Sequence, residues 1–134
     1  MRFSKTLGVG VMLIASIGAG QAARGSSEQV KRGETTYLDE CARCHSETLS
    51  GTEFGPALVG NDFVRNWAGK NVGDMFARVR ETMPVDGPGR LTGEQSVDVI
   101  AFILNENKLT FGDQPLPPEA AALKRIMINA MPIR

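Results

Sequence analysis

Histidine, cysteine and aromatic side chains are all scarce in this chain of 134 residues. The sequence has one histidine, two cysteines, six phenylalanines, one tryptophan and one tyrosine, so aromatic residues make up only 6%, whereas glycine occurs 15 times. The apolar side chains available for a core are therefore few for a chain of this length. We expect some other group to fill part of the centre.

An excess of charge of one sign is also lacking. The whole chain has 15 basic and 15 acidic residues, and removal of an N-terminal leader that contains Arg2 and Lys5 leaves 15 − 2 = 13 against 15, a net charge near −2. The charges are interspersed, which is typical of a solvated surface. The composition therefore argues against nucleic acid as a partner.

Long hydrophobic runs are missing except for one near the N-terminus. Residues 7–17 form an apolar run that follows Arg2 and Lys5 and precedes the small residues 19–23, which is the pattern of a cleaved signal peptide over residues 1–22. A spanning helix needs about 20 apolar residues, so we predict no stable membrane insertion. The sequence predicts a periplasmic protein of 134 − 22 = 112 residues, secreted across the inner membrane.

Both cysteines and the only histidine stand together in the segment CARCH, residues 41–45. A disulfide between Cys41 and Cys44 would close too small a loop to stabilise a domain much. A thioredoxin-like redox pair would follow a strand, whereas the residues before Cys41 predict a helix. A structural zinc ion needs four ligands, and this segment supplies three at most.

Covalent haem attachment accounts for all three residues. Two thiols three positions apart on one helical turn can each add to a haem vinyl group, and the next residue then directs its imidazole at the iron. We therefore predict one covalent haem c, bound through Cys41 and Cys44, with His45 as the proximal iron ligand.

A sixth iron ligand must come from another residue type, because His45 is the only histidine. Pro84 disfavours helical geometry at the preceding Met83, which places this methionine on an extended segment just after a predicted helix over residues 72–81. Each methionine could instead simply fill a gap in the core. We predict His45 and Met83 as the two metal ligands, from the candidates Met75, Met83, Met127 and Met131.

The residues around this motif resemble the class I cytochrome c family, which has one haem with histidine and methionine ligands. Gly33 and Tyr37 lie eight and four residues before Cys41, and Phe102 lies in the apolar run VIAFIL. The resemblance covers about residues 27–109 and implies an all-α fold, in which N- and C-terminal helices cross while short helices and loops wrap the haem. A glycine inside a helix costs about 1 kcal/mol relative to alanine, so Gly33 itself indicates a close helix neighbour.

The resemblance also implies roles for two further residues. Pro56, eleven residues after His45, matches the proline whose carbonyl accepts a hydrogen bond from the proximal histidine, although it could be a plain turn proline. Trp67 matches a tryptophan whose indole often donates to a haem propionate, or it could only pack. The segment 67–95 is similar to small cytochromes associated with quinoprotein dehydrogenases.

The domain organisation follows from these features. We expect a signal peptide at residues 1–22, a cytochrome c domain at 23–110 and a C-terminal extension at 111–134, with a short helix at 119–127. The apolar residues of the extension predict that it packs back on the domain or contacts a partner. Capping boxes predict helix starts at Ser26, with Gln29, and at Thr92, with Gln95.

With both axial positions filled by protein, the expected function is electron transfer and not enzymatic catalysis. We expect a soluble periplasmic one-electron carrier, monomeric or in transient complexes, that accepts electrons from a dehydrogenase such as a quinoprotein dehydrogenase and passes them toward a terminal oxidase. The alternatives are a dedicated cytochrome subunit of a dehydrogenase complex and a haem enzyme or gas-binding protein with an open iron site.

Overall fold

The structure is a computed structural model, and it describes residues 21–130. The predicted signal peptide lies outside the described residues except for its last two positions. None of the described helices is long and apolar enough to cross a membrane. The secondary structure is helical apart from one small sheet, and the elements are α1 Gln21–Glu40, α2 Ala42–His45, α3 Asn61–Trp67, α4 Val72–Thr82, α5 Gly93–Glu106, β1 Leu109–Thr110, α6 Ala120–Leu123 and β2 Asn129–Ala130.

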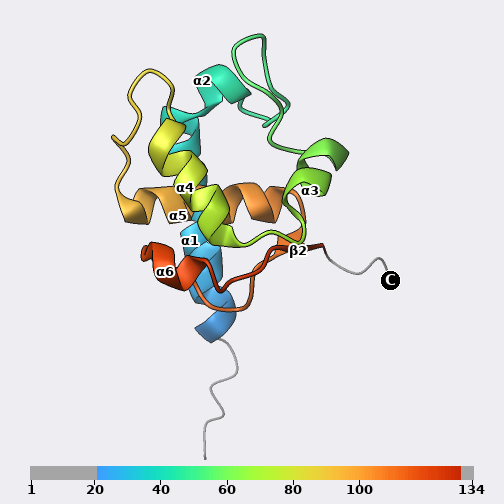
Figure 1. The fold of residues 1–134 in the computed structure, drawn as a ribbon, viewed down its shortest axis with the longest axis vertical. Coiled ribbons are helices and arrows are strands. Elements are labelled where there is room, and N and C mark those ends of the chain that lie inside the picture. Colours follow the sequence, from blue (N-terminus) through green and yellow to red (C-terminus); the bar gives the residue numbers. More distant parts are fainter. Residues whose placement is uncertain (1–20, 131–134) are drawn as a thin grey trace, which may run out of the picture.

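The fold is organised around the crossing of α1 and α5 (Figure 1). The two helices approach so closely that a Cβ atom at Gly33 would lie 1.9 Å from the carbonyl oxygen of Asp98 and 2.9 Å from the Cβ of Phe102. Beside this contact, the rings of Tyr37 and Phe102 pack with their centroids 5.3 Å apart. The close helix neighbour predicted from Gly33 is therefore confirmed, and it is α5.

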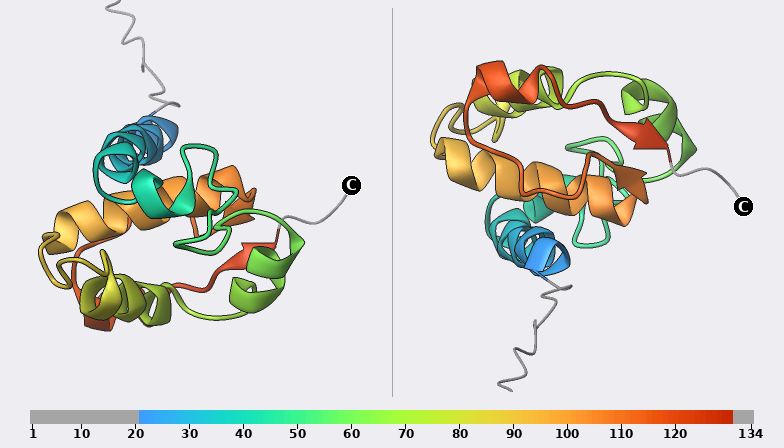
Figure 2. Two further views of the ribbon diagram at one scale, coloured as in Figure 1. Left: turned by 90° about the horizontal axis from the view of Figure 1, so that it is seen from above. Right: turned by 90° about the horizontal axis from the view of Figure 1, so that it is seen from below.

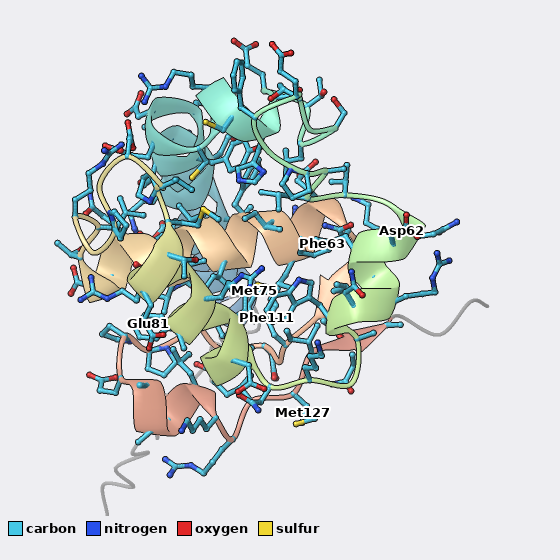
Figure 3. The ribbon with its side chains drawn as sticks, turned by 45° about the horizontal axis from the view of Figure 1, so that its top comes forward. Asp62, Phe63, Met75, Glu81, Phe111 and Met127 are labelled. Atoms are coloured by element: carbon cyan, nitrogen blue, oxygen red, sulfur yellow. The ribbon has the colours of Figure 1, made fainter. Side chains whose placement is uncertain are left out.

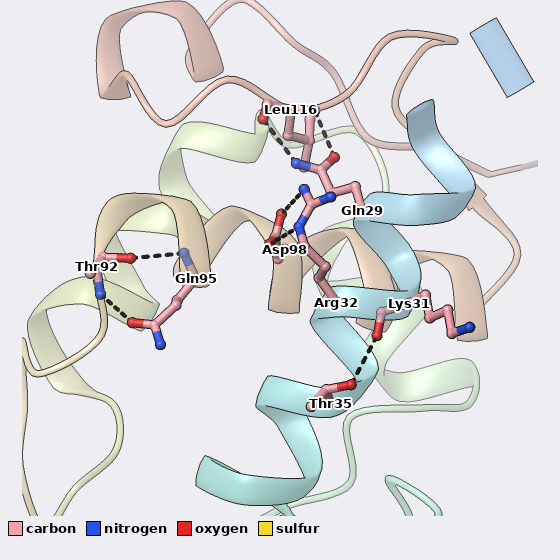
Figure 4. Close-up of polar contacts among 8 residues, drawn as sticks. All are labelled: Gln29, Lys31, Arg32, Thr35, Thr92, Gln95, Asp98 and Leu116. Atoms are coloured by element: carbon pink, nitrogen blue, oxygen red, sulfur yellow. Dashed lines mark hydrogen bonds and ion pairs between the residues drawn. The ribbon is translucent and has the colours of Figure 1, made fainter. Parts of the chain in front are cut away.

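Polar contacts reinforce the crossing (Figure 4). Arg32 on α1 holds the buried carboxylate of Asp98 on α5 with two hydrogen bonds of 2.8 and 3.0 Å. This hydrogen bond to Asp98 raises the pKa of Arg32. At the start of α5, Thr92 and Gln95 form the predicted capping box, in which each side chain accepts a hydrogen bond from the other residue's backbone N–H.

Helix α5 is the centre of the molecule. Every residue from Ser96 to Leu104 is buried, as expected for a helix that is apolar on several sides. Figure 2 shows the reason, because α1 lies on one side of α5 while α4 and α6 lie on the other.

The start of α1 differs from the prediction. The helix begins at Gln21, so Ser26 lies inside it and is not an N-cap. Gln29, expected to complete a capping box, is instead buried, and its side-chain amide makes two hydrogen bonds with the backbone of Leu116, at 2.8 and 3.0 Å (Figure 4). A tertiary contact 87 residues away has taken the place of a local one.

The C-terminal extension packs back on the helices. Its predicted helix at 119–127 is shorter than expected, since α6 ends at Leu123. The chain then runs beside the segment between α3 and α4, where Ile128 exchanges backbone hydrogen bonds with Gly69 and Lys70 at 2.8 and 2.9 Å. Strand β2 pairs antiparallel with β1. Three apolar side chains of the C-terminal extension are buried: Leu116, Leu123 and Ile128.

Candidate haem-attachment site

The CARCH segment lies directly after α1, at one end of the molecule (Figure 1). Cys41 is the N-cap of α2, and its backbone N–H still donates to Tyr37 at 2.8 Å, so the chain enters α2 almost without a break. The N–H groups of Cys44 and His45 both donate to the carbonyl of Cys41, at 3.1 and 3.0 Å. The two cysteines and the histidine therefore share one tight turn, as the spacing predicted.

The turn is held in place by Tyr37. Its hydroxyl donates a hydrogen bond of 2.7 Å to the carbonyl of Ser46, the residue that ends α2 with a positive φ of 71°. The ring is fully buried against Phe102, and this burial raises the pKa of Tyr37. One tyrosine thus connects the helix crossing to the CARCH turn.

His45 is buried, and its ring has a fixed orientation. The ring nitrogen Nδ1 lies 2.7 Å from the carbonyl oxygen of Pro56, which confirms the contact predicted for this proline. Since a carbonyl can only accept, Nδ1 donates in this contact, and in the neutral imidazole Nε2 then holds the lone pair that a metal ion would take. A histidine ligand is commonly oriented by such a bond from its second nitrogen.

A loop folded against the imidazole supports this bond. A Cβ atom at Gly55 would lie 3.0 Å from both Nδ1 and Cε1 of His45 and 2.8 Å from the carbonyl oxygen of Cys44, so a side chain at this position would press into the ring. Thr52 donates from its hydroxyl to the same Cys44 carbonyl at 2.6 Å. The sequence reasoning did not identify Gly55 or Thr52, and the only available signal was their position between His45 and Pro56.

The thiols of Cys41 and Cys44 are both free and half-buried. Burial, assisted by the neighbouring Glu40, raises the pKa of the Cys41 thiol to about 11. Among the described residues, no group of three or more His, Cys, Asp or Glu side chains is arranged to hold a metal ion. A covalently bound haem requires two thiols for its vinyl groups and an imidazole nitrogen for its iron. Two free thiols on one turn and the Nε2 of His45 can supply these, so the residues fit that group.

The structure places Met83 where the Met-Pro pair predicted. Helix α4 ends at Thr82, and Met83 has extended geometry, with φ −123° and ψ 147°, at the start of an irregular segment. We call this segment, residues 83–91, the strap. Met83 is half-buried there, and Figure 1 shows that the strap and the loop that contains Pro56 lie on opposite sides of α2.

The other methionines lie in different surroundings (Figure 3). Met75 is buried within α4 as part of the apolar core. Met127 is 45% exposed at the outer edge of the molecule, opposite Asn71 in an isolated bridge. Met131 lies outside the described residues.

Trp67 lies at the C-terminal end of α3 and is half-buried. Its ring packs near Phe63, with the centroids 6.4 Å apart, and the ammonium group of Lys70 lies 5.2 Å from the ring centroid. These contacts describe a packed tryptophan with a cation on its face. The propionate contact suggested for Trp67 stays a prediction.

Comparison with known proteins adds the family. The model of the family described as "Cytochrome C oxidase, cbb3-type, subunit III" matches residues 28–103, which is more than half of the chain. The chain belongs to this family of c-type cytochromes. The match spans α1 to α5 and includes the CARCH turn, Pro56 and Met83. A cytochrome c domain implies haem c and electron transfer, so this part of the prediction is confirmed at the level of the family.

A solved structure resembles this cytochrome over most of its length. It is the crystal structure of the sulfane dehydrogenase SoxCD from Paracoccus pantotrophus, in which the matching chain is 19% identical, with a TM-score of 0.51. The match covers 92% of this chain and 68% of that chain. At this identity the likeness shows the fold alone, and it confirms the predicted cytochrome c fold. No curated protein sequence matches the chain.

Proposed function

We propose that this cytochrome binds one haem c covalently through Cys41 and Cys44 and works as a periplasmic one-electron carrier. The observation that carries the proposal is the hydrogen bond between Nδ1 of His45 and the carbonyl of Pro56, because it directs the free Nε2 away from the supporting loop. Met83 is the proposed sixth ligand, since among the methionines that the structure describes it alone follows a helix end on an extended, half-buried segment.

Each residue has a specific task in this proposal. The two thiols would form thioether bonds that keep the cofactor in place, His45 would supply a rigidly oriented imidazole, and Met83 would supply a soft thioether. Bound in this way, the haem would supply one-electron exchange between ferrous and ferric iron. With protein ligands on both sides, the chain would leave no position for a substrate, which supports a carrier and not an enzyme.

Mass spectrometry of the denatured protein tests the attachment. Protein produced in a host competent for cytochrome c maturation should have the mass of the processed polypeptide plus one haem. Replacement of Cys41 and Cys44 together by alanine should remove the added mass, because no thioether can then form. A wild-type mass equal to that of the bare polypeptide would disprove the covalent attachment.

The family description and the similar solved structure support the partners that we propose. One is described as part of a cbb3-type oxidase and the other as a sulfane dehydrogenase. Both descriptions are compatible with a carrier that accepts electrons from a periplasmic dehydrogenase and passes them toward a terminal oxidase, and the second also favours a dedicated dehydrogenase subunit. Purification from the native host decides between these, since a subunit would remain bound to its dehydrogenase through gel filtration whereas a carrier would elute alone.

A further inference from the structure

The strap that carries Met83 is joined to the CARCH segment by charged side chains. Glu40 is the last residue of α1, and Arg43 stands between the two cysteines. Asp86 and Arg90 lie on the strap. We propose that these four residues form a clip that positions Met83 by holding the strap against the CARCH turn. This inference rests on the proposed function, since it concerns the residue named there as sixth ligand.

The contacts of the clip form one continuous chain. The guanidinium of Arg90 donates from Nε to Oε2 of Glu40 at 2.8 Å, and its Nη2 lies 2.6 Å from the same oxygen. Its Nη1 donates to Oδ1 of Asp86 at 2.9 Å, and the second oxygen of Asp86 accepts from Nη2 of Arg43. The contacts of the strap with Arg43 and Glu40 span 43 and 50 residues, so they join segments that are distant in the sequence.

The strap has internal hydrogen bonds that would transmit this restraint as far as Pro84, the residue after Met83. The N–H of Gly87 donates to the carbonyl of Pro84 at 2.9 Å, and the N–H of Arg90 donates to Gly87 at 3.3 Å. At the base, Arg80 on α4 donates to the carbonyl of Leu91. Met83 itself donates from its N–H to the carbonyl of Val79 on α4 at 3.1 Å, so α4 holds one side of this residue. Asp86 is three residues further along, and the clip would restrain the other side of Met83 through Pro84.

Apolar packing holds the strap mainly at its end. Leu91 is buried, whereas Val85, between Met83 and Asp86, is 75% exposed. An isolated ion pair at the surface is a weak restraint. Here, however, one planar guanidinium is shared between two carboxylates, which fixes its orientation better than a single contact would. The clip is therefore the main described link between the middle of the strap and the CARCH turn.

Displacement of Met83 by a small neutral ligand would report on the clip. Imidazole can bind ferric haem only when the sixth position is vacated, so its apparent affinity depends on how often the strap moves away. Loss of the clip should raise the fraction of molecules in which the strap has moved away. A neutral ligand is preferred to cyanide because its binding is not directly altered by a change in surface charge.

The test uses Asp86→Asn in the haem-loaded protein, which removes the strap carboxylate from both arginines. We expect imidazole to bind the ferric variant about five-fold more tightly than the wild type. This is the effect, at the upper end of the usual range, of losing the one ion pair of Asp86 that joins the strap to the CARCH turn, the pair with Arg43, since the pair with Arg90 lies within the strap. Hydrogen exchange should also become faster at the backbone amides of Gly87 and Arg90. The matched control is Asp62→Asn, which makes the same charge change in an ion pair confined to α3 and should alter neither result.

The outcomes separate this inference from the proposed function. If the wild-type ferric protein lacks the weak near-infrared band of sulfur ligation, Met83 is not the ligand, and the clip fails together with the ligand assignment of the proposed function, while the mass decides the haem attachment. If the band is present but Asp86→Asn matches Asp62→Asn in imidazole affinity, only the clip is overturned. A double variant that combines Asp86→Asn with Arg43→Gln provides the last check. The two substitutions should have less than additive effects on the free energy of imidazole binding, and full additivity would show that Arg43 and Asp86 act independently.

Discussion

Substitution of Gly33 by alanine tests the helix crossing on which the whole fold depends. The added Cβ would lie 1.9 Å from a backbone oxygen of α5, where an ordinary contact is about 3.5 Å, so the helices would have to separate by more than 1 Å. A backbone atom cannot rotate away as a side chain can. Separation would also stretch the two hydrogen bonds between Arg32 and Asp98 and loosen the packing of Tyr37 on Phe102.

The size of the effect can be worked out from two opposing contributions. Overpacking a close contact costs about 1–3 kcal/mol, and the upper end applies to Gly33 because the obstacle is backbone. Alanine returns about 1 kcal/mol through its better helix propensity. The net loss is about 2 kcal/mol, which corresponds to a fall in Tm of roughly 8 °C for a domain of this size.

Thermal unfolding of the haem-loaded protein, followed by circular dichroism, measures this loss. Gly93→Ala is the matched control, because Gly93 begins α5 and its Cβ would lie an ordinary 3.4 Å from Pro118. That variant should unfold at the wild-type temperature or slightly above. A Gly33→Ala protein with an unchanged Tm would mean that the crossing is looser than described, and the argument from close packing would be wrong.

Three other predictions concern the site and the tail. Met83→Ala should erase the near-infrared band of the ferric protein, lower its reduction potential and admit carbon monoxide to the ferrous form. Met75→Ala is the control and should keep the band. The reverse pattern would assign the ligand to Met75. Truncation after Leu109 should reduce the free energy of unfolding by roughly 5 kcal/mol, since three fully packed aliphatic side chains are lost, and an unchanged denaturation midpoint would contradict the described packing. Tyr37→Phe should lower stability at pH 7 by about 1 kcal/mol. Because burial raises the pKa of Tyr37, the stabilisation by its hydroxyl is present below pH ~10, the pKa in the unfolded chain, and declines as the pH rises further. The difference in free energy of unfolding between wild type and Tyr37→Phe should therefore narrow in alkaline solution. A difference that stays constant with pH would show that the hydroxyl is not buried.

The motif, the helix crossing and the proline contact could all be predicted from the sequence because each depends on a residue with few substitutes. Gly33 marks a contact that no larger residue permits, Thr92 and Gln95 form a cap between positions three residues apart, and Pro56 lies eleven residues after His45. The cap follows from local chemistry and Gly33 from helix propensity, whereas the Pro56 contact was implied by the resemblance to the cytochrome c family.

The features that were missed depend on partners far away in the chain. Ser26 and Gln29 have the spacing of a capping box, but the amide of Gln29 gains two buried bonds from Leu116, and α1 continues to Gln21. The predicted helix at 119–127 ends early because the carbonyl of Ile126 accepts from the N–H of Val72 at the start of α4, and Ile128 then bonds to Gly69 and Lys70. The contacts of Arg43 and Arg90 gave no local signal, since charged residues in loops usually face solvent.

The attachment of α1 to the CARCH turn has a consequence for how the two sides of the site open. The His45 side continues directly from α1, whose contact with α5 closes a loop of 66 residues between Arg32 and Asp98. Opening that side therefore requires the terminal helices to part, which is global unfolding. Residues 83–90 of the strap belong to no helix, and most of them are exposed, so we expect them to move away from the CARCH turn at a lower free energy than the crossing needs to open. With Met83 as sixth ligand, as proposed above, the two ligands would lie in regions of unequal local stability, and a ligand on the Met83 side would exchange many times within the lifetime of one folded molecule.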